Sequence, residues 1–233
     1  MKIANPSERT RAKEKVESRF TERGISRQRT RPMRKKGDEQ MKKKMLFFIT
    51  ALVVFLAFSS LVIAQTSAPT DERKRTEAGK YVTALEAYEM WKGNPNKVKI
   101  LDCRTPEEYV FVGHAPMANN IPSKVWIGKW NAEKKDYDLS DNPDFESEAK
   151  KRFSADDPIL VMCRSGHRSA ASVNRLTKAG FHQVYNIIDG FEGDKIKDGE
   201  SYYDGKRMKN GWRNSGAPWT YNLDLKLVYT FQK

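Results

Sequence analysis

The sequence predicts an α/β domain with a parallel sheet and helices on both of its faces. Three short apolar runs have the composition of strands, namely "VKIL" (98–101), "PILVM" (158–162) and "VYNII" (184–188). Continuous apolar runs are typical of strands buried on both faces, and strands that alternate with helices are typical of parallel sheets. Residues 65–233 are enough for one such domain with a single core.

Two capping boxes predict where the first two helices begin. Thr83 can act as an N-cap with Glu86 three residues later, and Thr105 repeats the pattern with Glu108. Pro106 stands at the first position of the second helix, where its missing N–H costs nothing. Three apolar residues fall on one face of the first helix, which favours that assignment: Leu85, Tyr88 and Trp91.

The sequence predicts secondary structure for only some of the remaining segments. "GHAPMANNIP" (113–122) predicts a loop and a short strand, whereas residues 123–157 are a charged, aromatic-bearing excursion for which no element is predicted. "SAASVNRLTKAG" (169–180) predicts a third helix that ends at Gly180.

The formal net charge of +13 arises mostly from the beginning of the chain. Residues 1–44 contain 16 of the 43 Lys and Arg residues but only 6 of the 30 Asp and Glu residues. The rest of the chain is therefore nearly balanced in charge. The basic character belongs to the N-terminal tail and gives no reason to expect a nucleic-acid partner for the folded part.

An uncharged run, "MLFFITALVVFLAFSSLVIA" (45–64), follows the basic "MKKK" (41–44). A positive start, an apolar middle and the residues Val62 and Ala64 are typical of a secretory signal peptide that is cleaved after Ala64. The same run could also span a bilayer as an uncleaved anchor. In both cases the basic residues stay in the cytoplasm, so the sequence predicts an exported, periplasmic domain, either free or membrane-anchored.

Residues 1–40 are polar, Arg-rich and without apolar periodicity. They are predicted to be a disordered basic tail, or to result from a misassigned start with Met41 as the true first residue. The remaining predicted divisions are a signal peptide or anchor over 41–64, a linker over 65–80, one folded domain over 81–222 and a C-terminal tail over 223–233.

Cys163 directly follows one predicted strand and precedes the third predicted helix. Ligands bind at this edge of open parallel sheets, and backbone N–H groups at a helix N-terminus form an anion cradle. Arg164 and Arg168 add positive charge, and His167 can add more. Because each of these features stabilises a thiolate, Cys163 is predicted to be a nucleophile with a lowered pKa. The alternative is a core cysteine at a strand end.

Several segments resemble the rhodanese (sulfurtransferase) family, in the order in which the family has them. "CRSGHRS" (163–169) resembles its active-site loop, and the other similar segments are "LDCRTPEEY" (101–109), "GHAPMANNIP" (113–122), "DGFEG" (189–193) and "GWRNSGAPW" (211–219). The resemblance implies a rhodanese-like domain with a central parallel five-stranded sheet. It also implies a cysteine that takes a sulfane sulfur from a donor, holds it as a persulfide and passes it to a thiol or cyanide, without a cofactor.

The resemblance assigns roles to nine residues. Cys163 becomes the nucleophile and persulfide carrier. The residues implied to form the cradle are Arg164, Ser165, Gly166, His167 and Arg168. The charged residues implied to support the site are Asp102, Arg104 and Glu108. The arginines of the cradle would attract an anionic small-molecule donor such as thiosulfate, and the acceptor would be a small thiol or a protein thiol.

Two other functions remain open. A Cys-based phosphatase needs an arginine after five intervening residues, but Ser169 stands there and Arg168 closes a shorter six-residue ring that suits sulfur better. A non-catalytic rhodanese-like module that carries or senses persulfide is the second alternative.

Two features depart from the family pattern. Cys103 stands where an aliphatic residue is usual, and is either a resolving thiol for Cys163 or a small buried residue. The insertion 194–210 is either a lid or partner surface, or a tolerated loop, and its acidic residues lack the spacing of a calcium loop, so no metal is predicted. Four tryptophans are predicted to be packing residues, although any could line the pocket: Trp126, Trp130, Trp212 and Trp219.

Overall fold

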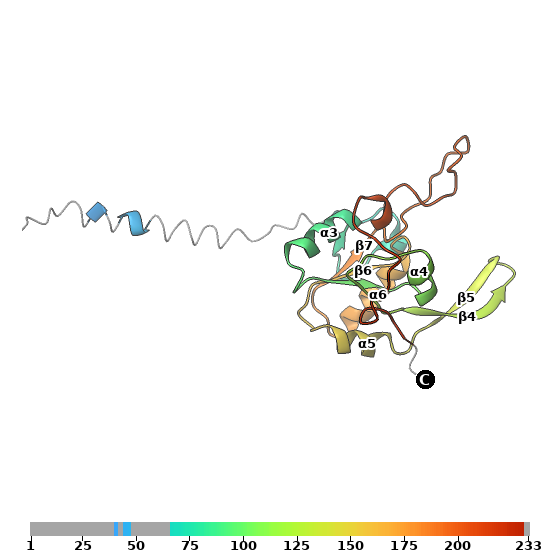
Figure 1. Ribbon diagram of the computed structural model, residues 1–233, viewed down its shortest axis with the longest axis horizontal. Coiled ribbons are helices and arrows are strands. Elements are labelled where there is room, and N and C mark those ends of the chain that lie inside the picture. The colour runs from blue at the N-terminus through green and yellow to red at the C-terminus, as the bar shows by residue number, and fades with distance from the viewer. Residues whose placement is uncertain (1–39, 42–43, 48–65, 231–233) are drawn as a thin grey trace, which may run out of the picture. The chain divides into compact units, whose positions relative to one another are not determined.

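The computed structural model describes residues 40–41, 44–47 and 66–230 (Figure 1). The chain divides into two units, Met1–Val62 and Ile63–Lys233, and the fold below is that of the second unit. No helix within the described residues is both long and apolar enough to cross a membrane.

Most of the N-terminal predictions concern residues outside this description. The predicted basic tail and the predicted signal peptide or anchor are described only at residues 40–41 and 44–47, which are helical. Cleavage after Ala64, the anchor alternative and the start at Met41 therefore stay predictions.

Five parallel strands form the central sheet, in the order β1-β7-β6-β2-β3. Their bounds are β1 (Tyr81–Val82), β2 (Lys99–Asp102), β3 (Ala118–Asn120), β6 (Ile159–Met162) and β7 (Val184–Ile187). Every residue of the central strand β6 is buried, as its continuous apolar sequence requires. The predicted five-stranded parallel sheet is thus confirmed.

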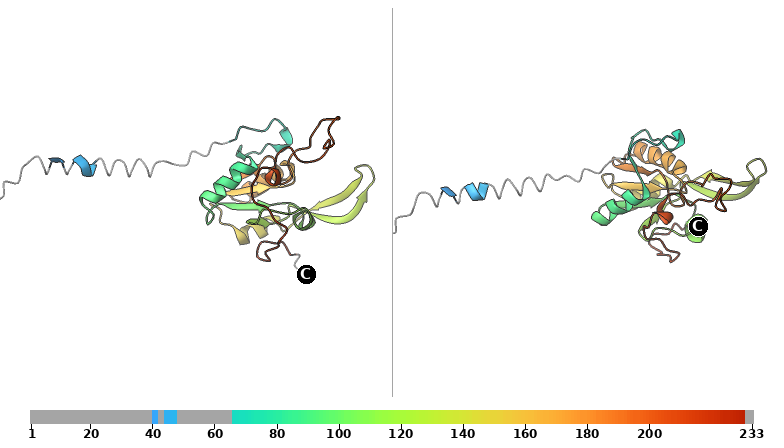
Figure 2. Two further views of the ribbon diagram at one scale, coloured as in Figure 1. Left: turned by 45° about the horizontal axis from the view of Figure 1, so that its top comes forward. Right: turned by 90° about the horizontal axis from the view of Figure 1, so that it is seen from above.

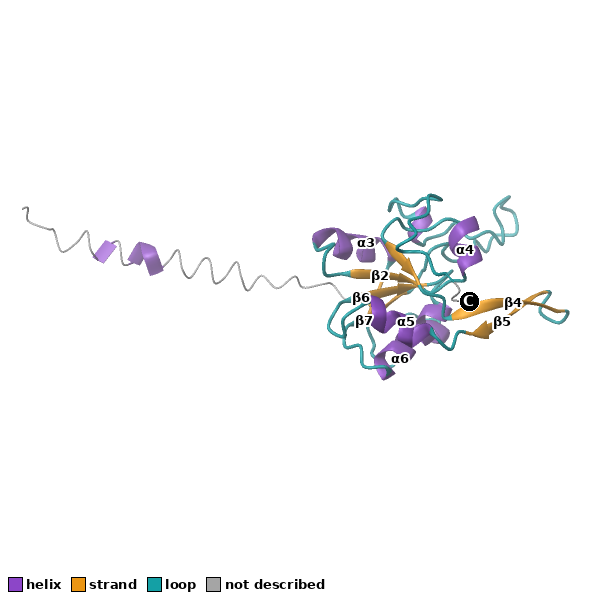
Figure 3. Cartoon of the chain, turned by 60° about the horizontal axis from the view of Figure 1, so that its bottom comes forward, coloured by secondary structure: helices purple, strands orange, loops and turns teal. Residues whose placement is uncertain are grey.

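Helices cover both faces of this sheet (Figure 3). One core cluster joins Ile100 of β2 to Ala87 of the first helix, and a second joins Leu101 of β2 to Val173 of the helix after β6. Neighbouring residues of a strand therefore pack on opposite faces. The helices are α3 (Ala84–Gly93) and α4 (Pro106–Phe111) on the first side, α5 (Phe145–Arg152) and α6 (His167–Lys178) on the second, and the short 3-10 helices η1 (Glu72–Lys74) and η2 (Trp212–Asn214).

Both predicted capping boxes are present. The Oγ1 atoms of Thr83 and Thr105 accept hydrogen bonds from the N–H groups three residues later, at 3.2 and 3.3 Å. In return, the carboxylates of Glu86 and Glu108 accept from the two threonine N–H groups, at 2.6 and 3.1 Å. These local signals fix the starts of α3 and α4.

The buried face of α3 differs from the apolar residues that suggested the helix. Leu85 is 48% exposed, while Tyr88 and Trp91 pack only at the margin of the core. Small side chains allow a helix to approach a sheet closely, and they occupy most of the buried face here. The buried residues of α3 are Ala84, Ala87 and Met90.

The excursion over 123–157 forms a hairpin and a helix. Strands β4 (Lys124–Asn131) and β5 (Asp136–Asp141) pair antiparallel in a sheet of their own, and α5 follows them. Figures 1 and 2 show the hairpin projecting from the domain. Neither strand has a fully buried residue, so the apolar alternation that predicts a strand is missing.

The predicted linker and C-terminal tail both lie against the domain. Lys74 of η1 is buried and forms an ion pair with Asp194 at 2.8 Å. Near the other end of the chain, the carbonyl of Leu227 accepts a hydrogen bond from the N–H of Asn120 at 2.8 Å. Partners far away in sequence hold these two segments, so local sequence patterns gave no sign of these contacts.

Candidate active site

Cys163 follows β6 at the carboxyl edge of the sheet, where the chain turns sharply into α6. The helix begins at His167, two residues earlier than predicted, because Gly166 with φ 95° serves as its N-cap. The turn is therefore only residues 164–166, and Arg168 already belongs to the first turn of the helix. Cys163 itself is 1% exposed.

Two groups at the start of α6 donate hydrogen bonds to the Cys163 sulfur. The Gly166 N–H lies 3.2 Å from Sγ and the Ser169 Oγ lies 3.4 Å from it. The partial positive charge of the helix N-terminus acts in the same direction. Ser169 is a site residue that the sequence analysis missed. The available signal was a hydroxyl residue in the first turn of a helix that starts beside the cysteine.

The segment after β7 anchors the turn from outside. The carbonyl of Cys163 accepts from the N–H of Phe191 at 2.8 Å, and the carbonyl of Arg164 accepts from the N–H of Glu192 at 3.0 Å. In a trans peptide the N–H points opposite to the carbonyl. The N–H groups of Arg164 and Ser165 therefore point away from the segment after β7, and the next N–H, of Gly166, contacts the sulfur.

Arg168 and Glu108 form a two-pronged ion pair beside the nucleophile. The guanidinium donates at 2.7 and 2.6 Å to the two carboxylate oxygens. Although burial opposes it, Arg168 holds the pKa of Glu108 below its ordinary value. Glu108, expected to support the fold near the site, thus orients the arginine whose charge acts on Cys163.

Cys103 lies beside Cys163 at the ends of adjacent strands. The register of β2 and β6 pairs Asp102 with Met162, which places the next residue of each strand side by side. Both cysteines are free buried thiols, and each shifts the pKa of the other. Cys103 is therefore a buried residue, as expected, but it also takes part in the site.

The pKa values of the two thiols are shifted in opposite directions. Burial disfavours a thiolate at Cys163, but the Cys103 hydrogen bond, the Arg168 charge and the Ser169 hydrogen bonds outweigh it and hold the pKa of Cys163 well below its ordinary value. Burial and the neighbouring Cys163 raise the pKa of Cys103 well above its ordinary value. The negative charge of the pair therefore rests on Cys163.

Alkylation with iodoacetamide should show this asymmetry. We expect Cys163 to react at a constant rate from neutral to alkaline pH and to slow only on acidification, when protonation removes the thiolate. Because its folded-state pKa is lowered, the thiolate also stabilises the fold above the pKa of an unfolded cysteine, and this stability is lost as the pH falls through the folded pKa. Peptide mass spectrometry should find the label on Cys163 rather than Cys103. A rate that still climbs about tenfold per pH unit near pH 8 contradicts the assignment.

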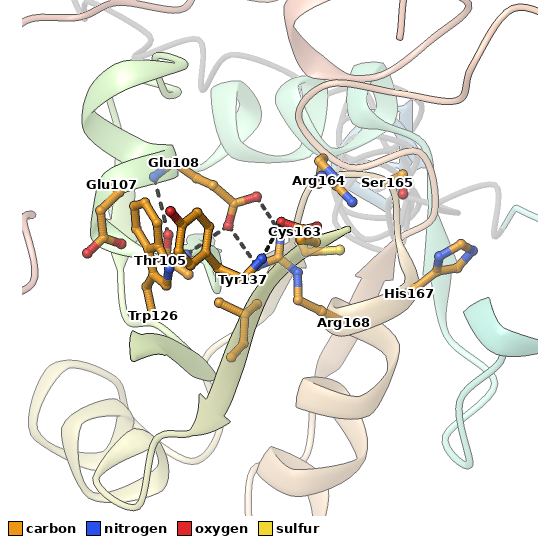
Figure 4. Close-up of a pocket in the computed structure, with 12 residues that line it drawn as sticks. Thr105, Glu107, Glu108, Trp126, Tyr137, Cys163, Arg164, Ser165, His167 and Arg168 are labelled. Carbon is orange, nitrogen blue, oxygen red and sulfur yellow. Dashed lines mark hydrogen bonds and ion pairs between the residues drawn. The ribbon is translucent and has the colours of Figure 1, made fainter. Parts of the chain in front are cut away.

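Three cradle residues do not touch the sulfur with their side chains. Arg164 is exposed, and Ser165 is buried but lines the pocket over Cys163. The Nε2 of His167 hydrogen-bonds the carboxylate of Asp71 at 2.9 Å, and the ring points away from Cys163 (Figure 4). The structure thus separates His167 from the sulfur, where the sequence analysis expected it to add charge.

Asp102 and Arg104 form a fully buried ion pair under the site, with Nη2 and Oδ2 2.6 Å apart. The same Nη2 donates to the carbonyl of Gly113 at 2.8 Å, and the guanidinium lies 4.1 Å from the centre of the Phe191 ring. The N–H of Phe191 donates to the carbonyl of Cys163, so one residue links this ion pair to the turn.

Replacing Asp102 by Asn should destabilise the domain by about 3–5 kcal/mol, because it leaves the buried Arg104 charge without its partner. Urea denaturation measures this loss. The alkylation rate of the protein that stays folded should remain close to wild type. A stability loss below about 1 kcal/mol would mean that the pair does not support the fold.

A pocket of about 430 Å³ lies over Cys163, between the turn and the β4–β5 hairpin (Figure 4). The hairpin side of the pocket was not foreseen, although aromatic residues in a charged excursion were a possible signal. Trp212 is fully buried as predicted, whereas Trp126 lines the pocket. The hairpin residues that line it are Trp126, Asp136, Tyr137 and Leu139.

The insertion 194–210 lies on the other side of the turn. The structure describes all of it, and none of its residues lines the pocket over Cys163, so it is not a lid on the nucleophile. It borders a separate cavity of about 640 Å³ together with Ser165 and His167. Within the described part of the chain, no group of three or more His, Cys, Asp or Glu residues is placed to hold a metal ion.

These features define an α/β domain in which Cys163 lies in a strand–turn–helix cradle at the carboxyl edge of a parallel sheet. The model of the rhodanese-like domain family matches residues 83–197. An uncharacterized protein of Rickettsia conorii is 32% identical over 140 residues, which cover 60% of this chain and 96% of that protein. Thiosulfate sulfurtransferase 16 of Arabidopsis thaliana, a chloroplastic protein, is 37% identical over 93 residues, which cover 40% of this chain and 70% of that protein.

Among solved structures, Rv0390 from M. tuberculosis is 30% identical, with a TM-score of 0.48 over 61% of this chain and all of that one. The chain belongs to the rhodanese family.

Proposed function

We propose that this protein is a sulfurtransferase that carries a sulfane sulfur as a persulfide on Cys163. The observation that carries the proposal is the environment of the Cys163 sulfur, which accepts hydrogen bonds from Gly166 and Ser169 and is acted on by the charge of Arg168. This environment stabilises an anionic sulfur in a small ring of donors, which a persulfide needs as much as a thiolate does.

In the first half-reaction, the Cys163 thiolate attacks the outer sulfur of an anionic donor such as thiosulfate. A new S–S bond forms at Cys163, the S–S bond of the donor breaks, and sulfite leaves with the electron pair. The charge of Arg168 and the exposed Arg164 favour approach of the dianion. The terminal sulfur, which keeps the negative charge, then takes the place of the thiolate among the donors of the turn.

In the second half-reaction, an acceptor thiolate or cyanide attacks that terminal sulfur. The bond from the terminal sulfur to Cys163 breaks, and the Cys163 thiolate is regenerated. Because the cradle stabilises the thiolate, it also makes Cys163 a good leaving group in this step.

Ser169 argues against phosphate-ester hydrolysis. A phosphatase loop would place an arginine at this position, whereas the buried Ser169 hydroxyl contacts the Cys163 sulfur and leaves a ring that closes at Arg168. A serine cannot provide the two parallel donors with which an arginine binds phosphate oxygens.

Incubation with thiosulfate tests the proposal. Intact-mass measurement should show one added sulfur atom on the wild type, which cyanide removes as thiocyanate, and no addition on Cys163→Ser. If wild type and variant behave alike, the proposal fails with this donor. A persulfide that forms but turns over poorly on every small donor and acceptor would favour a persulfide carrier or sensor instead. Hydrolysis of a phosphate ester, measured in parallel, should be absent.

We also propose that the domain works outside the cytoplasm, on the basis of the basic "MKKK" (41–44) and the uncharged run 45–64. Cell fractionation and N-terminal sequencing test this. A mature chain that begins at Gln65 in the periplasmic fraction supports cleavage, and an intact chain in the membrane fraction supports the anchor. An intact chain in the cytoplasmic fraction contradicts export.

A further inference from the structure

The pocket over Cys163 is larger than a small inorganic donor needs. Its volume of about 430 Å³ lies within the range of sites for organic small molecules. Cyanide and thiosulfate would fill only the end nearest Cys163 and would leave the hairpin side of the pocket untouched. Only a ligand with an organic body would also contact the hairpin residues that line the pocket.

The side of the pocket that the hairpin forms is largely apolar. The strand register pairs Trp126 with Leu139 and Trp130 with Tyr137, so these four side chains share one face of the hairpin. The rings of Trp126 and Tyr137 pack edge to face with their centres 5.0 Å apart. Both are nevertheless 44% exposed. A cluster of half-exposed aromatic side chains beside a nucleophile is typical of a binding surface.

The hairpin is held in place at its base. The ammonium of Lys124 and the carboxylate of Asp141 form an ion pair across the two strands at 2.6 Å. Strand β4 begins directly after Ser123, whose N–H donates to the carbonyl of Cys103 at 3.1 Å. The aromatic face is thus tied directly to the strand end beside the nucleophile.

Two polar groups of the pocket are available to a ligand. One carboxylate oxygen of Glu107, which lines the pocket, is buried and accepts no hydrogen bond from any described residue. A buried acceptor without a donor is costly, and an N–H of a ligand would satisfy it. Arg164 is exposed and lines the pocket, where its guanidinium can bind a carboxylate.

We propose that the acceptor is a small peptidic thiol, and that the hairpin determines this specificity. Its organic body lies on Trp126 and Tyr137, an amine or amide N–H satisfies Glu107, and a carboxylate reaches Arg164. This places the acceptor sulfur at the Cys163 persulfide. The acceptor thiolate attacks the terminal sulfur, the bond to Cys163 breaks, and the products are the peptidic persulfide and the Cys163 thiolate. The inference rests on the proposed sulfurtransferase function.

Single-turnover transfer from the preformed Cys163 persulfide tests it, with glutathione and cyanide as the two acceptors. Trp126→Ala should raise the glutathione concentration needed for half-maximal transfer by about tenfold more than it raises the corresponding cyanide concentration. Tyr137→Ala and Glu107→Gln should shift the same ratio in the same direction.

Ile127→Ala is the matched control, since Ile127 follows Trp126 on β4 and is 50% exposed but does not line the pocket. It should leave both transfers at wild-type levels. Equal losses toward glutathione and cyanide in Trp126→Ala would overturn the inference, and so would an equal effect of Ile127→Ala. Efficient transfer to a thiol protein but not to glutathione would also overturn it. Failure to load Cys163 at all would instead refute the proposed function.

Discussion

Replacing Arg168 by Gln should lower the rate of sulfur transfer by about a hundredfold or more, the usual consequence of removing one preorganised charge from a reacting centre. Arg168 is the cation that acts on Cys163, and it is also the partner that neutralises Glu108. Without it, a largely buried carboxylate faces the thiolate, so the pKa of Cys163 should rise and the thiolate population at neutral pH should fall. Single-turnover loading with thiosulfate and the pH profile of alkylation measure both effects.

Glu108→Gln is the matched control, because it breaks the same ion pair from the other side. It leaves the positive charge of Arg168 beside Cys163, so the pKa of Cys163 should stay low and loading should fall far less. Both variants should lose comparable stability in urea, which separates the effect of the charge from that of the pair. If Glu108→Gln loads as poorly as Arg168→Gln, the charge of Arg168 is not what activates the cysteine.

The parts of the fold that follow from local chemistry could be predicted from the sequence. The capping boxes at Thr83 and Thr105 involve residues only three positions apart, and the apolar runs identify β2, β6 and β7 without any knowledge of their partners. The start of α6 was placed two residues late because Gly166 caps it through its left-handed backbone, which leaves no side-chain signal.

The features that were missed depend on distant partners or on exposure. The pair Lys74 and Asp194 joins residues 120 positions apart and fixes a segment whose composition is that of a linker. The hairpin lacks the alternation of buried and exposed residues, and the register of β4 shifts between Trp126 and Trp130. For such elements the periodicity of the sequence carries no information, because no face is buried in a core.

The same division holds for the site. The apolar strand and the loop after it predict where Cys163 and the turn lie. Cys103 and Cys163 each directly follow a strand, and since these strands are neighbours in the sheet, the two cysteines lie side by side. The bond between Arg168 and Glu108 spans 60 residues. The sequence could propose both residues for the site but could not show that one orients the other.

Replacing Gly166 by Ala should abolish sulfur transfer and destabilise the domain by more than about 3 kcal/mol. Gly166 has φ 95°, and a Cβ at this position would collide with the backbone carbonyl of Ile188 after β7. A shift of the Gly166 backbone that relieves this collision would displace the N–H that donates to Cys163. Urea denaturation and loading with thiosulfate measure the two losses, and the pKa of Cys163 in any folded fraction should rise as the donor moves away.

Gly180→Ala separates backbone strain from this collision. Gly180, just beyond α6, has φ 100°, but a Cβ there would meet no atom within 4 Å. Its replacement should therefore cost only the roughly 1–2 kcal/mol of an alanine in a left-handed conformation and should leave loading unchanged. If Gly166→Ala resembles Gly180→Ala in both measurements, the close packing of the turn against the segment after β7 does not position the sulfur. The low pKa of Cys163 would then rest on Cys103, Arg168 and Ser169, which the collision does not involve.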